Sequence, residues 1–330
     1  MRRSGWWSSS GGIWADRLRY PDKVKSPGTS VGRLRASPKP GRQPVDKPRG
    51  AAFGADCPAC GGSLRPAQPW VRRCDACAFM MSTLHAGSGR GIEGLEAVRA
   101  LNFEMTLDRM EELLSTPDPM LLEVGCARGW FLERAARRGL RIEGIEPSPD
   151  SDRDADAGLI IRTGYFPEAL GERDSYDAIV FNDVFEHLPD PVAAIVEVER
   201  RLEPGGLAVL NLPSSDGAVF RIARCLHRFG LAGLYRRLWQ KGMASPHITY
   251  FNQGNLRCFV ERHTGLRQVC ASRMAVLTRE GLWDRIGSTW PGVAGLVIYP
   301  VAWLASFVLD WLPSDAILAI YRKDRHGSRG

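Results

Sequence analysis

The stretch that decides the fold is MLLEVGCARGW, residues 120–130. Its apolar run, Met120–Val124, has the length and composition of a buried β-strand. Gly125 follows the run and Gly129 opens the next segment, and glycine at such places lets a backbone turn tightly and approach a ligand closely. Ala127 stands between them, where a third glycine would suit such a turn. The stretch predicts a strand, a ligand-binding turn and a helix.

Strand and helix patterns alternate through the rest of the chain, which predicts an α/β fold with a doubly wound, mostly parallel sheet. The long excursion between the last two strands predicts one antiparallel insertion near an edge. The expected helices are 92–115, Trp130–Arg138, Val192–Leu202 (stopped by Pro204-Gly205-Gly206) and Asn255–His263. The expected strands are Met120–Val124, Leu140–Ile145, 157–162, Tyr176–Asn182, Leu207–Leu212, Leu266–Ala271 and Ala316–Arg322.

Two carboxylates indicate what the turn holds. Glu146 ends the second strand in GIEPS, about 20 residues after the turn, where a carboxylate can accept both ribose hydroxyls of a nucleoside. Glu123 lies just before the turn; it would repel a pyrophosphate and suits a cationic amino group or a sulfonium. The glycines also stop at G-x-A-x-G, short of a dinucleotide fingerprint. A nucleoside cofactor without pyrophosphate is therefore expected.

In order, LLEVGCARGWFLERAARRG, GIEPS, YDAIVFNDVFEHLPDP, LEPGGLAVLNLPS and PHITYF resemble the class I S-adenosylmethionine-dependent methyltransferases over roughly residues 92–275. The nearest group includes the ubiquinone-pathway O-methyltransferases and many enzymes of polysaccharide clusters. The resemblance implies a seven-stranded Rossmann-like sheet, S-adenosylmethionine as cofactor, and methyl transfer to a small-molecule or lipid-linked acceptor, a sugar, glycan or quinone-like ring. It is nearly silent on which acceptor, and on whether O, N or C is methylated.

The resemblance also implies roles for single residues. The methionine end of the cofactor would meet Asn182 and Asp183, the adenine would lie near the segment after the third strand, and His187 would lie near the transferring methyl. Ala127 departs from the family's usual glycine, and we expect it to be tolerated, at little cost if its φ is negative and at more if φ is positive. The expected cofactor residues are Glu123, Gly125, Ala127, Gly129, Glu146, Gly164, Tyr165, Phe166, Asn182 and Asp183.

Methyl transfer needs a base only if the acceptor must lose a proton. His187 and His247 are the two candidates, because the pKa of an imidazole is near neutral. Each is about as well explained as a hydrogen-bonded structural histidine. The spacing Asp183-x-x-Glu186-His187 also resembles the set of the ubiquinone-pathway methyltransferases in which a divalent metal is implicated.

Four of the eight cysteines form two Cys-x-x-Cys pairs separated by 13 residues. Two such pairs make a closed tetrahedral site that suits a structural Zn²⁺ and leaves no position for chemistry. A zinc ribbon is expected over residues 51–86, with a redox pair as the alternative. Because the other cysteines are scattered, we expect no disulfide framework and a cytoplasmic location. The expected ligands are Cys57, Cys60, Cys74 and Cys77.

The positive charge is concentrated at the start of the chain. Residues 1–50 carry 12 Lys or Arg and three acids, so the remaining 280 residues sum to −2 within the total of +7. Such a near-neutral remainder argues against a nucleic-acid partner. We expect residues 1–50 to be a disordered basic tail or an over-extended start, with attraction to anionic lipid as the alternative.

Two segments suggest contact with a membrane face. Residues 216–243 are amphipathic and Arg-rich, typical of a lid or a surface helix. Val293–Leu309, inside an insertion at 283–313, has no charge but is short for a membrane span, and we expect Pro300 to break it into a buried or interfacial hairpin. Two alternatives to a small-molecule methyltransferase stay open: an RNA methyltransferase whose ribbon reads RNA, and a non-catalytic zinc-stabilised scaffold.

Overall fold

The structure is a computed structural model that describes residues 55–88, 95–148, 158–276, 279, 282–289, 292–309 and 311–325. Its contacts divide the chain into one unit at Met1–Lys47 and a second at Pro48–Gly330. The expected basic tail, 1–50, and the first residues of the expected ribbon lie outside the described residues. All the described residues belong to the second unit.

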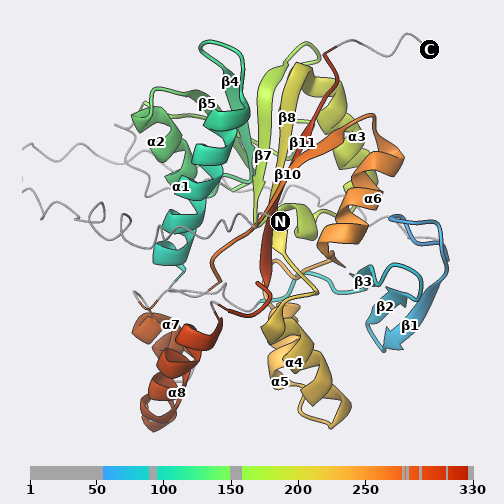
Figure 1. The fold of residues 1–330 in the computed structure, drawn as a ribbon, viewed down its shortest axis with the longest axis vertical. Helices are drawn as coiled ribbons and strands as arrows, with labels where there is room; N and C mark the ends of the chain where they lie inside the picture. The colour runs from blue at the N-terminus through green and yellow to red at the C-terminus, as the bar shows by residue number, and fades with distance from the viewer. Residues whose placement is uncertain are drawn as a thin grey trace, which may run out of the picture. The chain divides into compact units, whose positions relative to one another are not determined.

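A seven-stranded sheet forms the centre of this unit, in the order β10-β11-β8-β7-β4-β5-β6 (Figure 1). β4 pairs in parallel with β5 and β7, whereas β11 runs antiparallel to both of its neighbours. The α/β, Rossmann-like fold class and the antiparallel insertion are thereby confirmed. The strands are β4 (Met120–Val124), β5 (Arg141–Glu146), β6 (Ile160–Thr163), β7 (Tyr176–Asn182), β8 (Leu202–Pro213), β10 (Arg267–Arg273) and β11 (Ala316–Arg322).

Helices cover both faces of the sheet (Figure 1). α1 (Glu96–Leu113) and α2 (Trp130–Arg137) lie on one face, α3 (Pro191–Arg201) and α6 (Gln253–His263) on the other. Along β7, Ala178 and Val180 join the core under α1 and α2, while Ile179 and Phe181 join the core under α3 and α6. Successive side chains of a strand point to opposite faces, so a strand covered on both faces is apolar throughout. That is why β7 has a continuous apolar run.

The element bounds differ from the expected ones by a few residues, with the largest difference at β8. Pro204-Gly205-Gly206 does not end the preceding helix, which already stops at Arg201; it lies inside β8, which starts at Leu202. The pairing of β7 with β8 shifts register at this point, and Gly205 has φ +85°. A glycine in the left-handed region lets a strand bulge and continue, so the signal for a helix stop marked an irregular strand.

The cysteine segment forms a second, smaller sheet in the order β1-β2-β3-β9. Three strands come from the cysteine segment: β1 (Leu64–Gln68), β2 (Val71–Cys74) and β3 (Met80–Ser82). The fourth, β9 (Thr249–Tyr250), lies much later in the sequence, between β8 and β10 of the large sheet. Met80 pairs with Tyr250 and Met81 with Thr249. The ribbon and the PHITYF motif therefore share one sheet.

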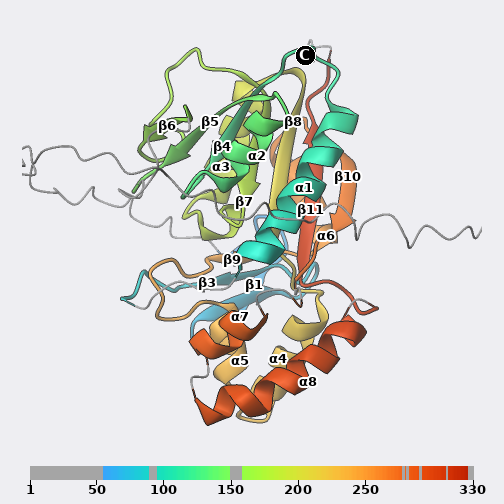
Figure 2. The same cartoon turned by 90° about the vertical axis from the view of Figure 1, so that its left-hand side faces the viewer.

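Two helical pairs lie at the same end of the described structure (Figure 2). They are α4 (Ala218–Arg228) with α5 (Gly233–Leu238), and α7 (Leu282–Thr289) with α8 (Val293–Leu309). α8 continues through Pro300, so the expected break at this residue is wrong, although proline removes one backbone hydrogen bond there. Among the residues described, every helix is too short or too polar to span a bilayer.

Candidate active site

A cavity of about 450 Å³ opens at the carboxyl ends of β4, β5 and β7, the place where doubly wound sheets bind ligands. Its lining includes six of the ten expected cofactor residues. Residues from α1 close its other side. The lining residues are Glu96, Arg99, Phe103, Glu123, Gly125, Cys126, Ala127, Arg128, Trp130, Phe131, Glu146, Ser148, Asn182, Asp183 and Val184.

The turn after β4 has three residues in the left-handed region: Gly125 (φ +73°), Ala127 (φ +46°) and Gly129 (φ +79°). A Cβ on Gly125 would come within 2.6 Å of a methyl group of Val184, so glycine is required there. The φ of Ala127 is positive, which is the more costly of the two cases expected for it. The left-handed conformation costs a non-glycine residue about 1–2 kcal/mol. Gly129 caps α2 but is not among the residues lining the cavity.

Glu146 is held in place at the end of β5. Its carboxylate accepts hydrogen bonds from the backbone N–H of Ala127 and of Ser148, both at 3.0 Å. A carboxylate offers about four lone-pair positions, so two remain for hydroxyl donors. The turn and the acid that the sequence brings together are therefore in direct contact.

Glu123 is buried beneath the same cavity, with 3% of its surface exposed. Its Oε1 accepts a hydrogen bond of 2.9 Å from Asn182 Nδ2, while its Oε2 is buried with no partner among the described residues. Burial, with a smaller contribution from the Glu146 carboxylate, raises the pKa of Glu123 to about 7. A cation brought to this oxygen would favour the ionised form.

One wall of the cavity was missed by the sequence reasoning. α1 supplies Glu96, Arg99 and Phe103, and Arg99 Nε lies 3.5 Å from Asp183 Oδ2. Trp130, at the start of α2, also lines the cavity. These side chains belong to no sequence motif that marks a ligand site. Their place in the cavity follows from the packing of α1 over the end of β4, which the sequence alone does not give.

The segment expected near the adenine is not part of the cavity lining. Phe166 packs edge-on against Phe181 at a ring separation of 5.8 Å, and the N–H of Gly164 donates to the carbonyl of Glu146. Tyr165 is likewise absent from the lining residues. The roles of Gly164, Tyr165 and Phe166 stay predictions.

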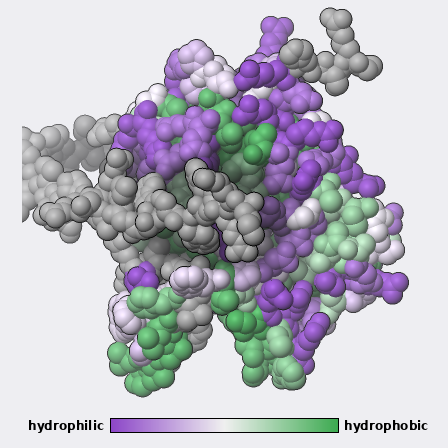
Figure 3. All heavy atoms as spheres, viewed as in Figure 1, coloured by the Kyte–Doolittle hydropathy of each residue, from purple (hydrophilic) through white to green (hydrophobic). Residues whose placement is uncertain are grey.

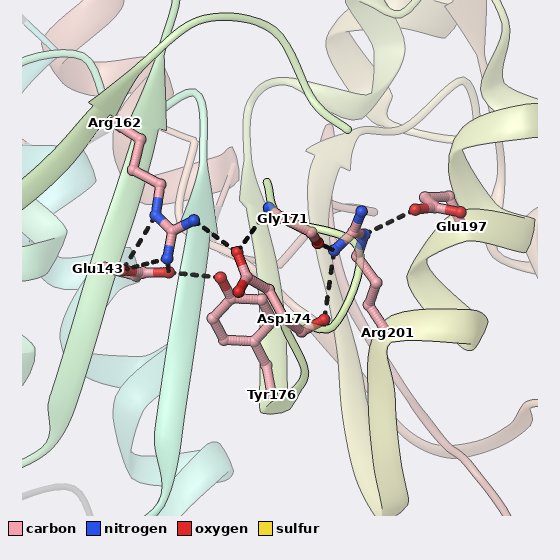
Figure 4. Close-up of polar contacts among 7 residues, drawn as sticks. All are labelled: Glu143, Arg162, Gly171, Asp174, Tyr176, Glu197 and Arg201. Carbon is pink, nitrogen blue, oxygen red and sulfur yellow. Dashed lines mark hydrogen bonds and ion pairs between the residues drawn. The ribbon is translucent and has the colours of Figure 1, made fainter. Parts of the chain in front are cut away.

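A polar network fixes the chain on either side of that segment (Figure 4). Arg162 pairs with Glu143 at 2.9 Å and with Asp174 at 2.5 Å, and the hydroxyl of Tyr176 donates to Glu143. Arg201 donates from α3 to the carbonyls of Gly171 and Asp174. The loop from β6 to β7 is therefore anchored at both ends, independently of any ligand.

The two candidate histidines lie together. Their rings are 4.8 Å apart, and each Nε2 is just under 4 Å from Oε1 of the buried Glu186. His187 Nδ1 lies 2.9 Å from the carbonyl of Pro246, which can only accept, so this nitrogen carries the proton and Nε2 keeps a lone pair. His247 Nε2 lies 3.0 Å from Gln240 Nε2. Neither histidine lines the cavity; Asp183 and Val184, which do, lead directly into the 3-10 turn that carries His187.

Burial sets the charge of this group. It lowers the pKa of His187 and, more strongly, that of His247, so both imidazoles are neutral near pH 7. Burial, together with the Asp183 carboxylate, raises the pKa of Glu186 well above its ordinary value. Within the described ranges, Glu186 Oε2 and His247 Nδ1 are buried without a hydrogen-bond partner. The set Glu186, His187 and His247 has the donor types of a metal site, whereas Asp183 is held by Arg99 and does not join it.

The four cysteines form one cluster. Sγ of Cys57 lies 3.6 Å from that of Cys77, Sγ of Cys60 lies 3.5 Å from that of Cys74, and all four lie within 4.8 Å of one another. These separations are far longer than a disulfide bond. They match the spacing of about 3.8 Å expected around a tetrahedral zinc with Zn–S distances of about 2.3 Å. The residues therefore fit a structural Zn²⁺.

A model described as a methyltransferase domain matches residues 95–270, which is more than half of the chain. The chain belongs to this methyltransferase domain family. With the fold, this makes it a class I S-adenosylmethionine-dependent methyltransferase. The expected enzyme class is confirmed.

Individual relatives of this methyltransferase match shorter stretches. An uncharacterised methyltransferase of Mycobacterium leprae is 35% identical over 97 residues, 28% of this chain and 36% of that protein. A ubiquinone biosynthesis O-methyltransferase of Xanthomonas campestris is 28% identical over 134 residues, 38% of this chain and 56% of that protein. The methyltransferase thus spans between about a third and just over a half of the length of these curated relatives.

Among solved structures, the cyclopropane synthase MmaA2 of Mycobacterium tuberculosis matches with a TM-score of 0.47 and 14% identity, over 72% of this chain and 90% of that one. A phosphoethanolamine N-methyltransferase of Haemonchus contortus in complex with S-adenosylmethionine matches with a TM-score of 0.47 and 14% identity, over 71% and 56%.

Proposed function

We propose that this methyltransferase holds S-adenosylmethionine in the cavity at the ends of β4, β5 and β7, and methylates a small acceptor that lies beside His187. The observation that carries the cofactor assignment is the pair of acids on one cavity: Glu146, fixed by the turn, and Glu123, with one unpartnered buried oxygen. Glu146 would accept from the ribose hydroxyls, and Glu123 with Asn182 would meet the cationic methionine end.

Calorimetric titration of the full chain with S-adenosylmethionine tests this assignment. We expect saturable one-site binding to the wild type, and at least tenfold weaker binding to Glu123→Ala. Arg257→Gln breaks an ion pair with Glu261 on α6, outside the cavity lining, and should bind like the wild type. Absence of binding by the wild type would refute the assignment.

When bound, the cofactor supplies an electrophilic methyl group, and the protein's task is alignment and, for a protonated acceptor, proton removal. His187 is suited to remove the proton, because its Nε2 keeps a lone pair while Pro246 holds its Nδ1–H. His247 stands behind it and contacts Gln240, so we assign it second. His187→Gln should lower kcat about 100-fold or more with little change in cofactor affinity, as measured by steady-state kinetics and calorimetry once an acceptor is known.

The cysteine cluster is proposed as a structural zinc site. It would lie in a ribbon over residues 51–86, which the structure describes from residue 55, ahead of a methyltransferase domain over 92–325. The cluster supports the wall of the acceptor side. Ser82 Oγ donates to the carbonyl of His247 at 2.7 Å, the N–H of Ser82 donates to the carbonyl of Ile248, and the N–H of Ile248 donates to the carbonyl of Glu186. Metal analysis of the purified chain should give one zinc per chain, lost on Cys57→Ser.

A lipid-linked acceptor met at the inner face of a membrane is supported by the apolar surface of the helical pairs. The side chains of Val297 and Val301 on α8 are 64% and 65% exposed, and Phe229 between α4 and α5 is 79% exposed. Figure 3 shows hydrophobic surface gathered at the outer ends of both pairs. Co-sedimentation with anionic vesicles tests this. The double variant Val297→Ser, Val301→Ser should reduce the vesicle-bound fraction of the protein at least twofold, and an unchanged bound fraction would contradict the proposal.

A further inference from the structure

Four arginines gather where the ribbon sheet meets α4, and we call them the arginine cluster: Arg73, Arg221, Arg224 and Arg228. Arg73 lies on β2, two positions after Val71 and therefore on the same face of the strand. Val71 packs in one core cluster with Phe220 and Ala223 of α4 and with Tyr235 of α5. Arg73 thus lies on the face of β2 that packs against the helical pair. The other three arginines follow one another along α4 at three- and four-residue steps; Arg224 is half-buried, and Arg221 and Arg228 are exposed.

The arginine cluster has no acidic partner among the described residues: none of its members takes part in an ion pair there. Burial lowers the pKa of Arg224, and the charges of Arg73, Arg228 and Arg221 lower it further. Nε of Arg73 is buried and makes no hydrogen bond to the part of the chain that the structure describes. Like charges brought together and partly desolvated are unfavourable unless an anion lies among them.

The segment around the cluster is strongly basic. Residues 216–243 carry six Lys or Arg and one acid, Asp216. The carboxylate of Asp315 accepts hydrogen bonds from the backbone N–H groups of Val219 and Phe220 at the start of α4. It is therefore committed to capping and does not neutralise the arginines.

A continuous row of rings connects the arginine cluster to the candidate base. The positive charges of Arg224 and Arg73 act to lower the pKa of the Tyr235 phenol, although burial raises it overall. The ring centroids of Tyr235 and Trp239 are 6.3 Å apart. Trp239 contacts Tyr250 at 4.9 Å, and Tyr250 contacts His247 at 5.3 Å. Tyr235 lies in α5, which ends at Leu238, and Gln240, whose Nε2 lies 3.0 Å from His247 Nε2, follows in the next turn. The arginine cluster and the histidine pair therefore border the same buried aromatic core.

We propose that the arginine cluster binds the phosphate or diphosphate group of the methyl acceptor. Guanidinium groups pair with phosphate oxygens through two parallel hydrogen bonds, and several arginines around one site suit a diphosphate better than a single charge. The proposal rests on the proposed function, since it places a phosphorylated end of the acceptor on the cluster and its methylated end beside His187. The phosphate would come from a soluble phosphorylated acceptor or from a lipid-linked one.

Titration of the full chain with inorganic pyrophosphate at fixed ionic strength tests the proposal. We expect saturable binding that weakens at least tenfold in Arg73→Gln and in Arg224→Gln, because each removes hydrogen bonds to a charged group. Arg257→Gln is the matched control and should bind like the wild type. The melting temperature of each variant without ligand should stay at or above the wild-type value, because repulsion is relieved.

Vesicles of phosphatidylglycerol and of phosphatidylcholine separate the two sources of phosphate. Binding to pyrophosphate without retention on either vesicle supports a soluble acceptor. Retention on phosphatidylglycerol alone that both arginine variants abolish supports a lipid-linked one. Absence of both kinds of binding, or binding that the variants leave unchanged, overturns the proposal. If pyrophosphate binds as expected while S-adenosylmethionine does not, the proposed function fails and the anion site stands.

Discussion

The two ends of the candidate site are built in different ways. The cofactor end is local: the turn and Glu146 lie within 30 residues of one another and are joined by a backbone hydrogen bond from Ala127. The acceptor end is assembled from distant parts of the chain, because Ser82 of the ribbon bonds to His247, 165 positions later. The local end depends on a few side chains, whereas the assembled end depends on whether the ribbon folds.

This difference has a physical consequence for stability. Strands β4, β5 and β7 are buried on both faces, so the cofactor end is supported by the main core. The strand β9 has two residues and pairs with β3, so its position depends on the small sheet and on the cysteines that hold it. Perturbation of the metal should therefore affect the two ends unequally.

The largest effect is expected at the local end. Glu146→Ala removes the acceptor of two ribose hydroxyls, each a hydrogen bond to a charged group worth about 1.5–3 kcal/mol, so cofactor affinity should fall about 100-fold. Calorimetry measures it. Glu133→Ala removes a partly exposed acid on α2 that pairs with Arg137; it serves as the control and should leave affinity within twofold. Equal affinity of Glu146→Ala and wild type would show that this acid does not hold the ribose.

The assembled end can be tested by removing the metal. Treatment with a chelator, or Cys60→Ser, should reduce methyl transfer at least tenfold while cofactor affinity stays within twofold, because Ser82 no longer holds His247 and Ile248. Far-UV circular dichroism should retain most of the signal of the large sheet. Cys225→Ser changes an exposed cysteine outside the cluster and should have no effect. A parallel loss of cofactor binding would mean that the two ends are not independent.

The same difference explains what the sequence could predict. The strands Met120–Val124, Tyr176–Asn182 and Ala316–Arg322 were predicted with their observed bounds, because each is a dense apolar run between clear boundaries. The proximity of His187 and His247 was not predicted, nor was the pairing of β3 with β9, since both arise from contacts between segments 60 or more positions apart. The prediction that Pro300 breaks the segment was wrong, because α8 continues through this residue. A proline inside a helix lowers the helix's stability but does not always end the helix.

A pH titration tests the charge at the cofactor end. The pKa of Glu123 is raised to about 7 by burial, so near pH 6 most of this acid is protonated, and near pH 8 most is ionised. A cationic ligand prefers the ionised form, so cofactor affinity should rise about tenfold from pH 6 to pH 8 and fall as the pH drops through 7. Calorimetry at the two pH values checks this. Glu123→Gln should bind more weakly and lose most of the dependence; an unchanged pH profile in that variant would assign the effect to another group.

The smallest effect concerns Ala127 in the turn. Its φ of +46° costs a non-glycine residue about 1–2 kcal/mol, whereas glycine adopts this conformation freely but loses more entropy on folding, about 0.5–1 kcal/mol. Ala127→Gly should therefore stabilise the chain by about 0.5–1 kcal/mol, near 2 °C in melting temperature, and leave the N–H that Glu146 accepts in place. Ala136→Gly makes the same chemical change on an exposed position inside α2, where it should destabilise by about 1 kcal/mol. Two shifts of the same sign would mean that the turn is not strained, and the alanine would then need no compensation from the ligand it faces.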